Sequence, residues 1–375
     1  METPAPDELI GRVFGGHYRI ERHLRRGGMG AIYQARDTRS DAVVAVKVVR
    51  AALLDDAQAV ARFKREIRLV TEIVHENIVL ALDSGDDDGV LWIAMELLTG
   101  DTLRERLDAR GRMPWQETLP LIEQIVGALG AAHERVVIHR DLKPENVMLI
   151  EQPGLLKAKL LDFGVAKQVC VEGGAEQSHM TGTGYIVGTP GYVAPELVLE
   201  GVSDDPRSDF YALGVIWFEM LTGQAPFSAK TAFALAMRHA HEQPPTPTSL
   251  VPYSPVPAPI ERLVLRLMSK APNDRPAHAR ELLGLLHNLA DESQRSLLVT
   301  ALHDSEPTVT DFNGRRTGVA PFTPPPGATT SSTSATPALA MVGGPSPTPA
   351  PELLRQLPRS WLVGGALLPP SSPPA

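Results

Sequence analysis

The chain is constrained most strongly by one octet, His-Arg-Asp-Leu-Lys-Pro-Glu-Asn at residues 139–146, and by Asp-Phe-Gly at residues 162–164. Carboxylate and amide oxygens are ligands that Mg²⁺ accepts in proteins, and Asp162 and Asn146 supply one of each. The octet also contains a carboxylate that can accept a proton, Asp141, and a lysine that can face a phosphate, Lys143. A lone His-Arg-Asp occurs in many loops, but the complete set predicts a catalytic centre.

On these residues the chain resembles the protein kinases, specifically the bacterial eukaryotic-like (Hanks-type) serine/threonine kinases. The resemblance implies transfer of the γ-phosphate of ATP, with Mg²⁺ or Mn²⁺, by positioning and electrostatic stabilisation. It implies that Asp162 and Asn146 hold the metal ions. It further implies that Asp141 orients the substrate hydroxyl and accepts its proton, while Lys143 contacts the γ-phosphate. A lysine at position 143 is typical of kinases that act on Ser or Thr rather than Tyr.

A lysine and a glutamate upstream fit the same family. The run Ala42–Arg50 is dense in β-branched residues and predicts a strand. Its Lys47 resembles the strand lysine that contacts the α- and β-phosphates. Taken alone, Lys47 would be a solvated lysine and Glu66 a surface glutamate on an amphipathic helical stretch. Together they predict an ion pair that fixes the lysine for the nucleotide.

The segment from Leu24 to Ile32 predicts the glycine-rich nucleotide loop, between a first strand at 18–24 and the Lys47 strand. A side chain at a loop glycine would block the approach of backbone N–H groups to phosphates. In the pattern G-x-G-x-x-G, Arg25 stands where the first glycine is expected, and this departure bears on nucleotide affinity. The ATP-contacting positions implied here are Leu24, Gly27, Gly28, Gly30 and Ile32, with Ala45 on the next strand.

The run Leu91–Leu98 resembles the last strand of the small lobe and the hinge to the large lobe. The resemblance implies that Met95 lies behind the adenine and that the backbone of Glu96 and Leu98 meets its edge. It also implies that Leu149, just beyond the octet, contacts the nucleotide.

An activation segment is expected from Asp162 to Ala-Pro-Glu at 194–196, because this stretch lacks periodicity and is rich in Gly and Thr. The resemblance implies that Thr189 bonds to Asp141 and Lys143. Thr181 and Thr183 resemble the paired autophosphorylation sites of bacterial kinases, and a phosphate there can order the loop through an arginine. The alternative is a polar loop with incidental threonines.

Three further charged residues are expected to be scaffold rather than chemistry. Asp209 opens a helix that is apolar on nearly all sides, and a carboxylate there must be paired. The resemblance implies that Asp209 holds the backbone around residues 139 and 140. It also implies a buried ion pair between Glu196 and Arg275.

Composition limits the other classes of function. The net charge of −8 gives no indication of nucleic-acid binding, which would need a basic face. The first 17 residues do not resemble a signal peptide, and no stretch approaches the ~20 apolar residues of a membrane helix. A single cysteine, Cys170, cannot form an internal disulfide and agrees with a reducing compartment. We therefore expect a cytoplasmic protein. The alternative is membrane association through the short apolar run at 361–368.

The predicted fold is α+β, a two-lobed kinase fold with a Pro-rich C-terminal tail. We expect a short leader at 1–17, a kinase domain at 18–288 and a disordered tail at 289–375. Within the domain, a β-rich lobe with one helix spans about 18–98 and a mainly helical lobe about 99–288.

The predicted function is transfer of the γ-phosphate of ATP to Ser or Thr of protein substrates in bacterial signal transduction. Autophosphorylation of the loop, within a kinase–kinase dimer, is expected as well. Three alternatives remain: a pseudokinase that binds nucleotide and signals by association, a kinase of small molecules, and a kinase that serves mainly to deliver the tail. The first normally lacks Lys47, Asp141 or Asp162, and the second lacks the Ala-Pro-Glu segment.

Overall fold

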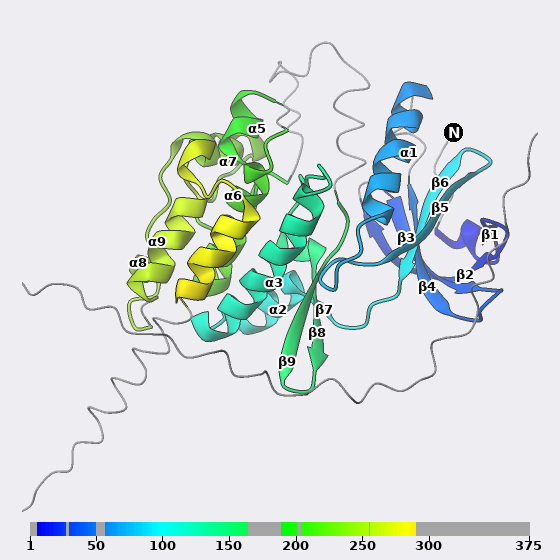
Figure 1. Ribbon diagram of the computed structural model, residues 1–375, viewed down its shortest axis with the longest axis horizontal. Coiled ribbons are helices and arrows are strands. Elements are labelled where there is room, and N and C mark those ends of the chain that lie inside the picture. The colour runs from blue at the N-terminus through cyan, green and yellow to red at the C-terminus, as the bar shows by residue number, and fades with distance from the viewer. Residues whose placement is uncertain are drawn as a thin grey trace, which may run out of the picture. The chain divides into compact units, whose positions relative to one another are not determined.

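The structure is a computed structural model of the chain and describes residues 6–27, 30–49, 57–163, 189–201, 204–254 and 256–289. An antiparallel sheet forms the N-terminal part, with the strand order β1-β2-β3-β4-β6-β5 (Figure 1). β-branched valines dominate the central strand β4, where a pleated surface buried on both sides suits them. The strands are β1 (Val13–Phe14), β2 (Tyr18–Gly27), β3 (Gly30–Asp37), β4 (Val43–Val49), β5 (Ala81–Asp87) and β6 (Val90–Glu96).

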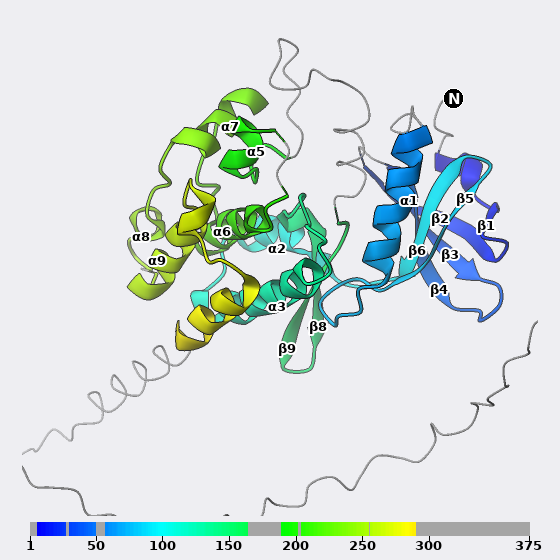
Figure 2. The same ribbon diagram turned by 45° about the horizontal axis from the view of Figure 1, so that its top comes forward.

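The two faces of this sheet have different roles. Figures 1 and 2 show helix α1 (Ala57–Thr71) on one side of the sheet, beside β5 and β6. On the other face of the sheet, buried apolar side chains form what we call the outer core. Its members are Leu9, Phe14, Tyr18, Ile20, Tyr33, Ala35, Val44, Val46, Val48, Trp92 and Ala94.

The packed sheet begins before the predicted boundary at residue 18. The 3-10 helix η1 (Pro6–Leu9) packs on β2, and Leu9 and Phe14 are buried in the outer core. These apolar side chains cover valines of the sheet that would otherwise face water. The segment expected as a leader is therefore part of the folded unit from residue 6 onward.

The rest of the described chain is mainly helical and packs around α6 (Arg207–Thr222). Every residue of α6 from Ser208 to Thr222 is buried, as a helix that is apolar all round requires. Helices α3, α8 and α9 pack against it, and the left-handed Gly223 (φ 73°) ends it. The helices are α2 (Leu103–Arg110), α3 (Trp115–His133), α5 (Pro195–Leu199), α6, α7 (Ala232–His241), α8 (Pro247–Leu250), α9 (Ala258–Leu267) and a last segment at 279–289, with the 3-10 turns η3 (Pro144–Asn146) and η4 (Pro272–Asp274).

A second, small sheet carries the functional loops. Its three strands are β7 (Asp101–Thr102), β8 (Val147–Gln152) and β9 (Leu155–Leu160), in that order. Leu160 at the end of β9 forms an isolated bridge with Ile78, which precedes β5. This bridge ties the helical part to the six-stranded sheet two residues before Asp162.

The predicted α+β arrangement, a β-rich part with one helix followed by a mainly helical part, is confirmed for the described residues. Within those residues, none of the helices combines the length and the apolar character that crossing a membrane would require. The predicted tail at 290–375 lies outside the described residues.

Candidate active site

The loop at 139–146 is fixed from beneath by one buried carboxylate, that of Asp209 at the start of α6. Its Oδ1 accepts the backbone N–H of Arg140 at 2.9 Å, and its Oδ2 accepts the backbone N–H of His139 at 2.8 Å. Nε2 of His133 donates to the same Oδ2 at 2.8 Å. Burial acts to raise the pKa of Asp209, but the hydrogen bond from His133 and the nearby donors and charges lower it below its ordinary value. Asp209 is thus an ionised, paired carboxylate.

These bonds stabilise an unusual backbone. Arg140 has φ 58°, in the left-handed region that non-glycine residues rarely adopt. Both N–H groups at the bend, those of residues 139 and 140, end on Asp209. The Arg140 side chain points outward and donates to the exposed carboxylate of Asp204 at 2.7 Å. Asp141 follows directly after this bend.

Asp141 lies at the centre of a compact polar group. The Oγ1 of Thr189 donates to its Oδ1 at 3.1 Å, and Lys143 Nζ donates to its Oδ2 at 3.1 Å. Lys143 Nζ also donates to Thr189 Oγ1 at 3.1 Å, which closes a triangle. Nδ2 of Asn146 donates to the backbone carbonyl of Asp141 at 2.8 Å. Four residues predicted from the sequence therefore meet within hydrogen-bond distance.

His139 connects this loop to the segment that carries Asp162. Its Nε2 lies 3.0 Å from the carbonyl of Leu161, and because a carbonyl only accepts, this nitrogen carries the proton. Its ring lies 4.7 Å from that of Phe163, centroid to centroid. Burial lowers the pKa of His139, so it is a neutral side chain. The backbone N–H of Leu161 also donates to the carbonyl of Asn146 at 2.9 Å, which sets Asp162 beside the loop.

Lys47 of β4 reaches Asp162 directly, with 2.7 Å between Nζ and Oδ1. Asp162 has φ 47°, which turns its side chain out of the line of β9. The exposed fractions of the two side chains, 16% for Lys47 and 30% for Asp162, show that the pair borders an open space rather than the core. The predicted partner Glu66 lies in α1, but its side chain is outside the described residues.

The residues predicted to hold metal ions present suitable oxygens. Nδ2 of Asn146 donates to Asp141, so its amide oxygen Oδ1 faces the other way and can act as a ligand. Asp162 contributes a partly exposed carboxylate. Oxygen ligands of this kind, with part of the coordination left to water and phosphate, are what Mg²⁺ uses in nucleotide sites. The donor set fits the predicted ion.

Strand register brings four predicted nucleotide contacts to one face of the sheet. Ile32 pairs with Lys47, and Ala45 pairs with Met95, so their side chains share the face opposite to the outer core. We call Ile32, Ala45, Lys47 and Met95 the cleft face. Because Lys47 reaches Asp162, this face covers the catalytic loop.

The turn between β2 and β3 requires glycine at its C-terminal end. Gly27 pairs with Gly30, and a Cβ added to Gly30 would collide with the carbonyl oxygen of Val48. Leu24 lies in a register shift just before the turn. Gly28 lies outside the described residues, as do Thr181, Thr183 and Cys170.

The hinge carries a contact that the sequence did not predict. The carboxylate of Glu96 lies 2.5 Å from Nζ of Lys159 and accepts the backbone N–H of Leu80 at 2.8 Å. The backbone N–H of Glu96 donates to Leu80 at 3.0 Å, so this N–H is not the group that meets an adenine. Leu98 is partly exposed, whereas Leu149 is buried in the helical core.

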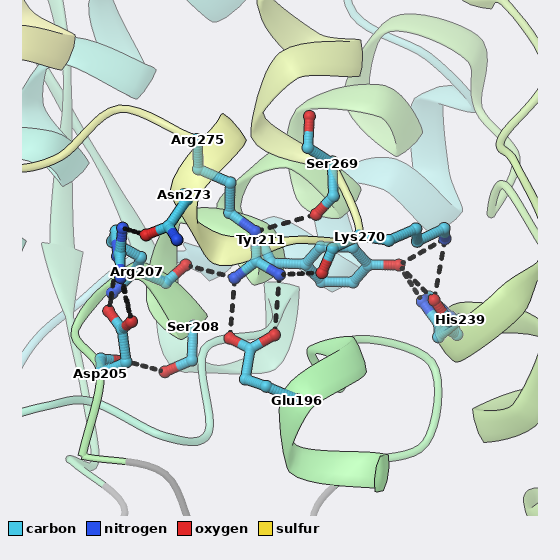
Figure 3. A network of polar contacts seen from close by, with 10 residues as sticks. All are labelled: Glu196, Asp205, Arg207, Ser208, Tyr211, His239, Ser269, Lys270, Asn273 and Arg275. Carbon is cyan, nitrogen blue, oxygen red and sulfur yellow. Dashed lines mark hydrogen bonds and ion pairs between the residues drawn. The ribbon is translucent and has the colours of Figure 1, made fainter. Parts of the chain in front are cut away.

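The predicted scaffold pair, Glu196 and Arg275, lies deep in the helical part (Figure 3). Two parallel bonds of 2.7 Å join the guanidinium to the carboxylate. Arg275 also donates to the backbone carbonyls of Ser269 and Arg207, and it lies 5.1 Å from the ring centroid of Tyr211. A buried guanidinium whose donors are this fully used fixes the described residues around Ala-Pro-Glu at 194–196.

The buried network continues from Tyr211 to His239 of α7 (Figure 3). The hydroxyl of Tyr211 lies 3.0 Å from Nδ1 of His239, and Nζ of Lys270 donates to the backbone carbonyl of His239 at 2.8 Å. Burial lowers the pKa of His239 to about 4 and that of Lys270 to about 8. His239 is therefore neutral at physiological pH.

The side chains of Arg104, Tyr192 and Glu219 form a further polar cluster that the sequence did not predict. Arg104 of α2 donates to the hydroxyl of Tyr192 at 2.7 Å and to Glu219 at 2.9 Å, and Tyr192 donates to Glu219 at 2.6 Å. Burial and the nearby carboxylate of Glu219 raise the pKa of Tyr192. No motif marks these three residues, which lie up to 115 positions apart along the chain.

The sequence of the chain is similar to those of known proteins. The profile of the protein kinase domain family matches residues 18–285. The serine/threonine-protein kinase Pkn3 of Myxococcus xanthus is 39% identical over 299 residues, which cover 79% of this chain and 54% of Pkn3. The serine/threonine-protein kinase PrkC of Bacillus subtilis is 35% identical over 274 residues, which cover 73% of this chain and 40% of PrkC. The chain thus spans about half the length of these relatives, or less.

A solved structure agrees with the fold. The crystal structure of the PknI kinase domain of Mycobacterium tuberculosis matches with a TM-score of 0.58 and 28% sequence identity. The match covers 74% of this chain and 98% of the PknI chain.

Proposed function

Because the chain belongs to the protein kinase family, we propose that it transfers the γ-phosphate of ATP to Ser or Thr residues of protein substrates. The observation that carries this proposal is the triangle of Asp141, Lys143 and Thr189, with its three contacts of 3.1 Å, close to the Lys47–Asp162 pair. In the triangle, Asp141 offers a proton acceptor and Lys143 a cation. In the pair, Asp162 offers a metal ligand and Lys47 a contact for phosphate.

In the proposed reaction Asp141 accepts a hydrogen bond from the substrate hydroxyl and takes its proton as that oxygen bonds to the γ-phosphorus of ATP. The bond between the γ-phosphorus and the oxygen of the β-phosphate breaks, and ADP leaves. The bonds from Thr189 and Lys143 aim the carboxylate before the substrate arrives, so little reorganisation is needed. Lys143 also neutralises charge on the phosphoryl group in transfer. The close pairing of Lys143 and Thr189 supports Ser/Thr rather than Tyr substrates.

Asp162 and Asn146 would hold Mg²⁺, which would supply positive charge to offset the negative charge of the ATP phosphates. Lys47, now paired with Asp162, would then exchange that partner for the phosphates. Ile32, Ala45 and Met95 would cover the adenine from above, because they share the face on which Lys47 lies. The roles of Glu66 and the loop glycines stay predictions.

Two charged groups serve the reaction without touching substrate. Asp209 keeps the backbone before Asp141 bent, and the pair Glu196–Arg275 keeps the end of the activation segment in place. We assign both as positioning elements. Loop autophosphorylation at Thr181 and Thr183 within a kinase–kinase dimer, and a cytoplasmic location, extend the proposal on the sequence pattern alone.

The test is an autophosphorylation assay. Purified wild type and Lys47→Met are incubated with Mg²⁺ and labelled ATP, and the phosphorylated residues are mapped by mass spectrometry. Label in the wild type alone, on Ser or Thr, supports the proposal, and label on Thr181 or Thr183 adds control by the loop. If there is no label, a generic substrate such as casein or myelin basic protein is added. Failure there as well, with ATP still bound, would favour a pseudokinase.

A further inference from the structure

Arg104 of α2 joins two carboxylates that come from distant parts of the chain. Its Nη2 lies 2.9 Å from Oε1 of Glu219 in α6, and its Nε lies 3.5 Å from Oε1 of Glu145 in η3. Nη2 also donates to the hydroxyl of Tyr192 at 2.7 Å, and this hydroxyl donates to Oε2 of Glu219 at 2.6 Å. Nη1 donates to the exposed carboxylate of Asp108 at 3.4 Å. We call Arg104, Glu145, Tyr192 and Glu219 the arginine cluster.

Two members of the arginine cluster are directly connected to the catalytic triangle. Glu145 belongs to the same octet as Asp141 and Lys143. The backbone N–H of Tyr192 donates to the carbonyl of Thr189 at 3.0 Å, and Thr189 in turn bonds to Asp141. Tyr192 also lines a small hollow together with Asp141 and Thr189. The arginine cluster therefore borders the place where a substrate hydroxyl would meet Asp141.

A protein substrate would bring more than its hydroxyl to this place. The backbone of an extended segment advances by about 3.3 Å per residue, so a residue two positions from the phosphorylated Ser or Thr lies only about 7 Å away. Arginine and lysine have long, flexible stems that carry the charge well beyond the backbone. A basic side chain near the phosphorylated residue would therefore meet the charges of the arginine cluster.

The carboxylates of the cluster are suited to hold a guanidinium, and Arg104 already supplies one. Carboxylates bind arginine through charge-assisted hydrogen bonds, and a buried carboxylate is costly without a cation. Arg104 and Tyr192 use both oxygens of Glu219, whose side chain is only 9% exposed. Oε2 of Glu145 is buried and has no hydrogen-bond partner among the described residues. Without Arg104, two carboxylates beside Asp141 would lack their cation.

We propose that Arg104 determines which substrates the kinase accepts, because its guanidinium occupies the place that a basic residue of a substrate would take. The site then accepts proteins without requiring Arg or Lys close to the phosphorylated Ser or Thr. The inference rests on the proposed function, since it assigns a protein substrate to Asp141. Arg104 is a specificity-determining residue in this account and touches none of the reacting atoms.

The test compares peptides that carry one Ser and differ only in charge beside it. Arg or Gln is placed at each of the three positions on either side of Ser, and kcat and KM are measured with the full chain. Two neutral variants, Arg104→Gln and Arg104→Met, remove the charge, and Arg104→Lys keeps it. Arg106→Gln is the matched control, because Arg106 lies on the same helix but pairs with Glu151 and Asp101 instead.

We expect the wild type, Arg104→Lys and Arg106→Gln to use Arg and Gln peptides within about twofold of each other at every position. The neutral variants are expected to favour Arg over Gln roughly tenfold in kcat/KM at one position, mainly through a lower KM, since two carboxylates are then open to the substrate. Glu145→Gln added to Arg104→Gln should remove most of this gained preference.

A roughly tenfold preference for Arg in the wild type would overturn the inference and leave the kinase proposal intact. The same holds if neutral variants that unfold at the temperature of the wild type gain no preference. Absence of transfer to every peptide would also overturn it, because an undemanding site accepts the Gln peptides. Casein then decides the rest: no transfer to casein overturns the kinase proposal as well.

Discussion

The catalytic loop at 139–146 and the cleft face of the sheet carry neighbouring parts of one site, but different forces hold them. Beneath the loop lie Asp209, with three hydrogen bonds of 2.8–2.9 Å, and the buried pair Glu196–Arg275. The cleft face, in contrast, is defined by strand register and by apolar side chains that are still partly open, such as Ile32.

The difference follows from what each region must do. A proton acceptor has to be aimed to within a fraction of an ångström, and buried charge fixes geometry strongly because any loosening leaves it unpaired. A nucleotide base needs only apolar side chains that pack against its flat face. Substitutions at Asp209 or in the pair Glu196–Arg275 should therefore lower both the stability and the activity. Substitutions on the cleft face should lower the affinity for nucleotide alone.

The largest effect is expected from Asp209→Asn. In the wild type, three donors bond to the two carboxylate oxygens of Asp209: His133 Nε2 and the backbone N–H groups of residues 139 and 140. Asparagine replaces one of these oxygens by an NH₂ group, which cannot accept. At least one buried donor therefore loses its partner. We expect a loss of about 3 kcal/mol in the free energy of unfolding and of more than about 10²-fold in phosphoryl transfer. Urea unfolding and a labelled-ATP assay measure the two. Asp204→Asn is the control, since that exposed carboxylate contacts the same arginine, Arg140, from outside. Equal, small effects of both substitutions would contradict the comparison.

A smaller effect, on the free energy of unfolding, is expected when the pH is lowered, because the buried network around Tyr211 contains His239. The pKa of His239 falls from 6.5 to about 4 on burial, so between these values the unfolded chain binds a proton that the folded chain does not. Stability should therefore fall as the pH is lowered through this window, by about 2 kcal/mol between pH 7.5 and 5. His239→Gln should remove this share of the pH dependence in urea unfolding.

The exposed His287 provides the control for that experiment. His287→Gln should leave the slope of stability against pH as it is in the wild type. A slope that is the same in wild type and His239→Gln would show that the buried network does not hold a neutral histidine.

The smallest effect is expected from Ile32→Ala on the cleft face. The substitution shortens a partly exposed side chain that would cover the base, so nucleotide affinity should drop about fivefold, equivalent to about 1 kcal/mol. Stability and the maximal rate should change little. Calorimetry and saturation kinetics separate these quantities. A fall in the maximal rate with affinity intact would mean that the cleft face takes part in aiming the reacting groups.

The sequence allowed the two-lobed fold to be predicted, and with it the contact of three motif residues, because the type and spacing of these residues can be read without knowing where their loops lie. Asp141, Lys143 and Thr189 meet in the structure, although Thr189 is 46 positions from Lys143. The buried character of α6 could be predicted as well, since its apolar residues cover all sides.

The missed contacts are of another kind. His133 beneath Asp209, Lys159 beside Glu96, and the cluster of Tyr192 with Glu219 join residues that no local pattern connects. Periodicity shows which face of an element is buried but not which polar group meets it across the core. For the same reason the N-terminal segment was predicted as a leader, although Phe14 in it is fully buried.

The central claim is that this site transfers phosphate through Asp162, and one measurement tests it most directly. The rate of label transfer from ATP to a Ser/Thr-containing protein is compared between wild type and Asp162→Asn, with thermal unfolding of both recorded. Our account predicts a loss of roughly 10³-fold or more in rate, because a metal ligand and the partner of Lys47 are removed, with the fold unchanged. A well-folded Asp162→Asn that keeps its rate to within tenfold of the wild type would contradict it.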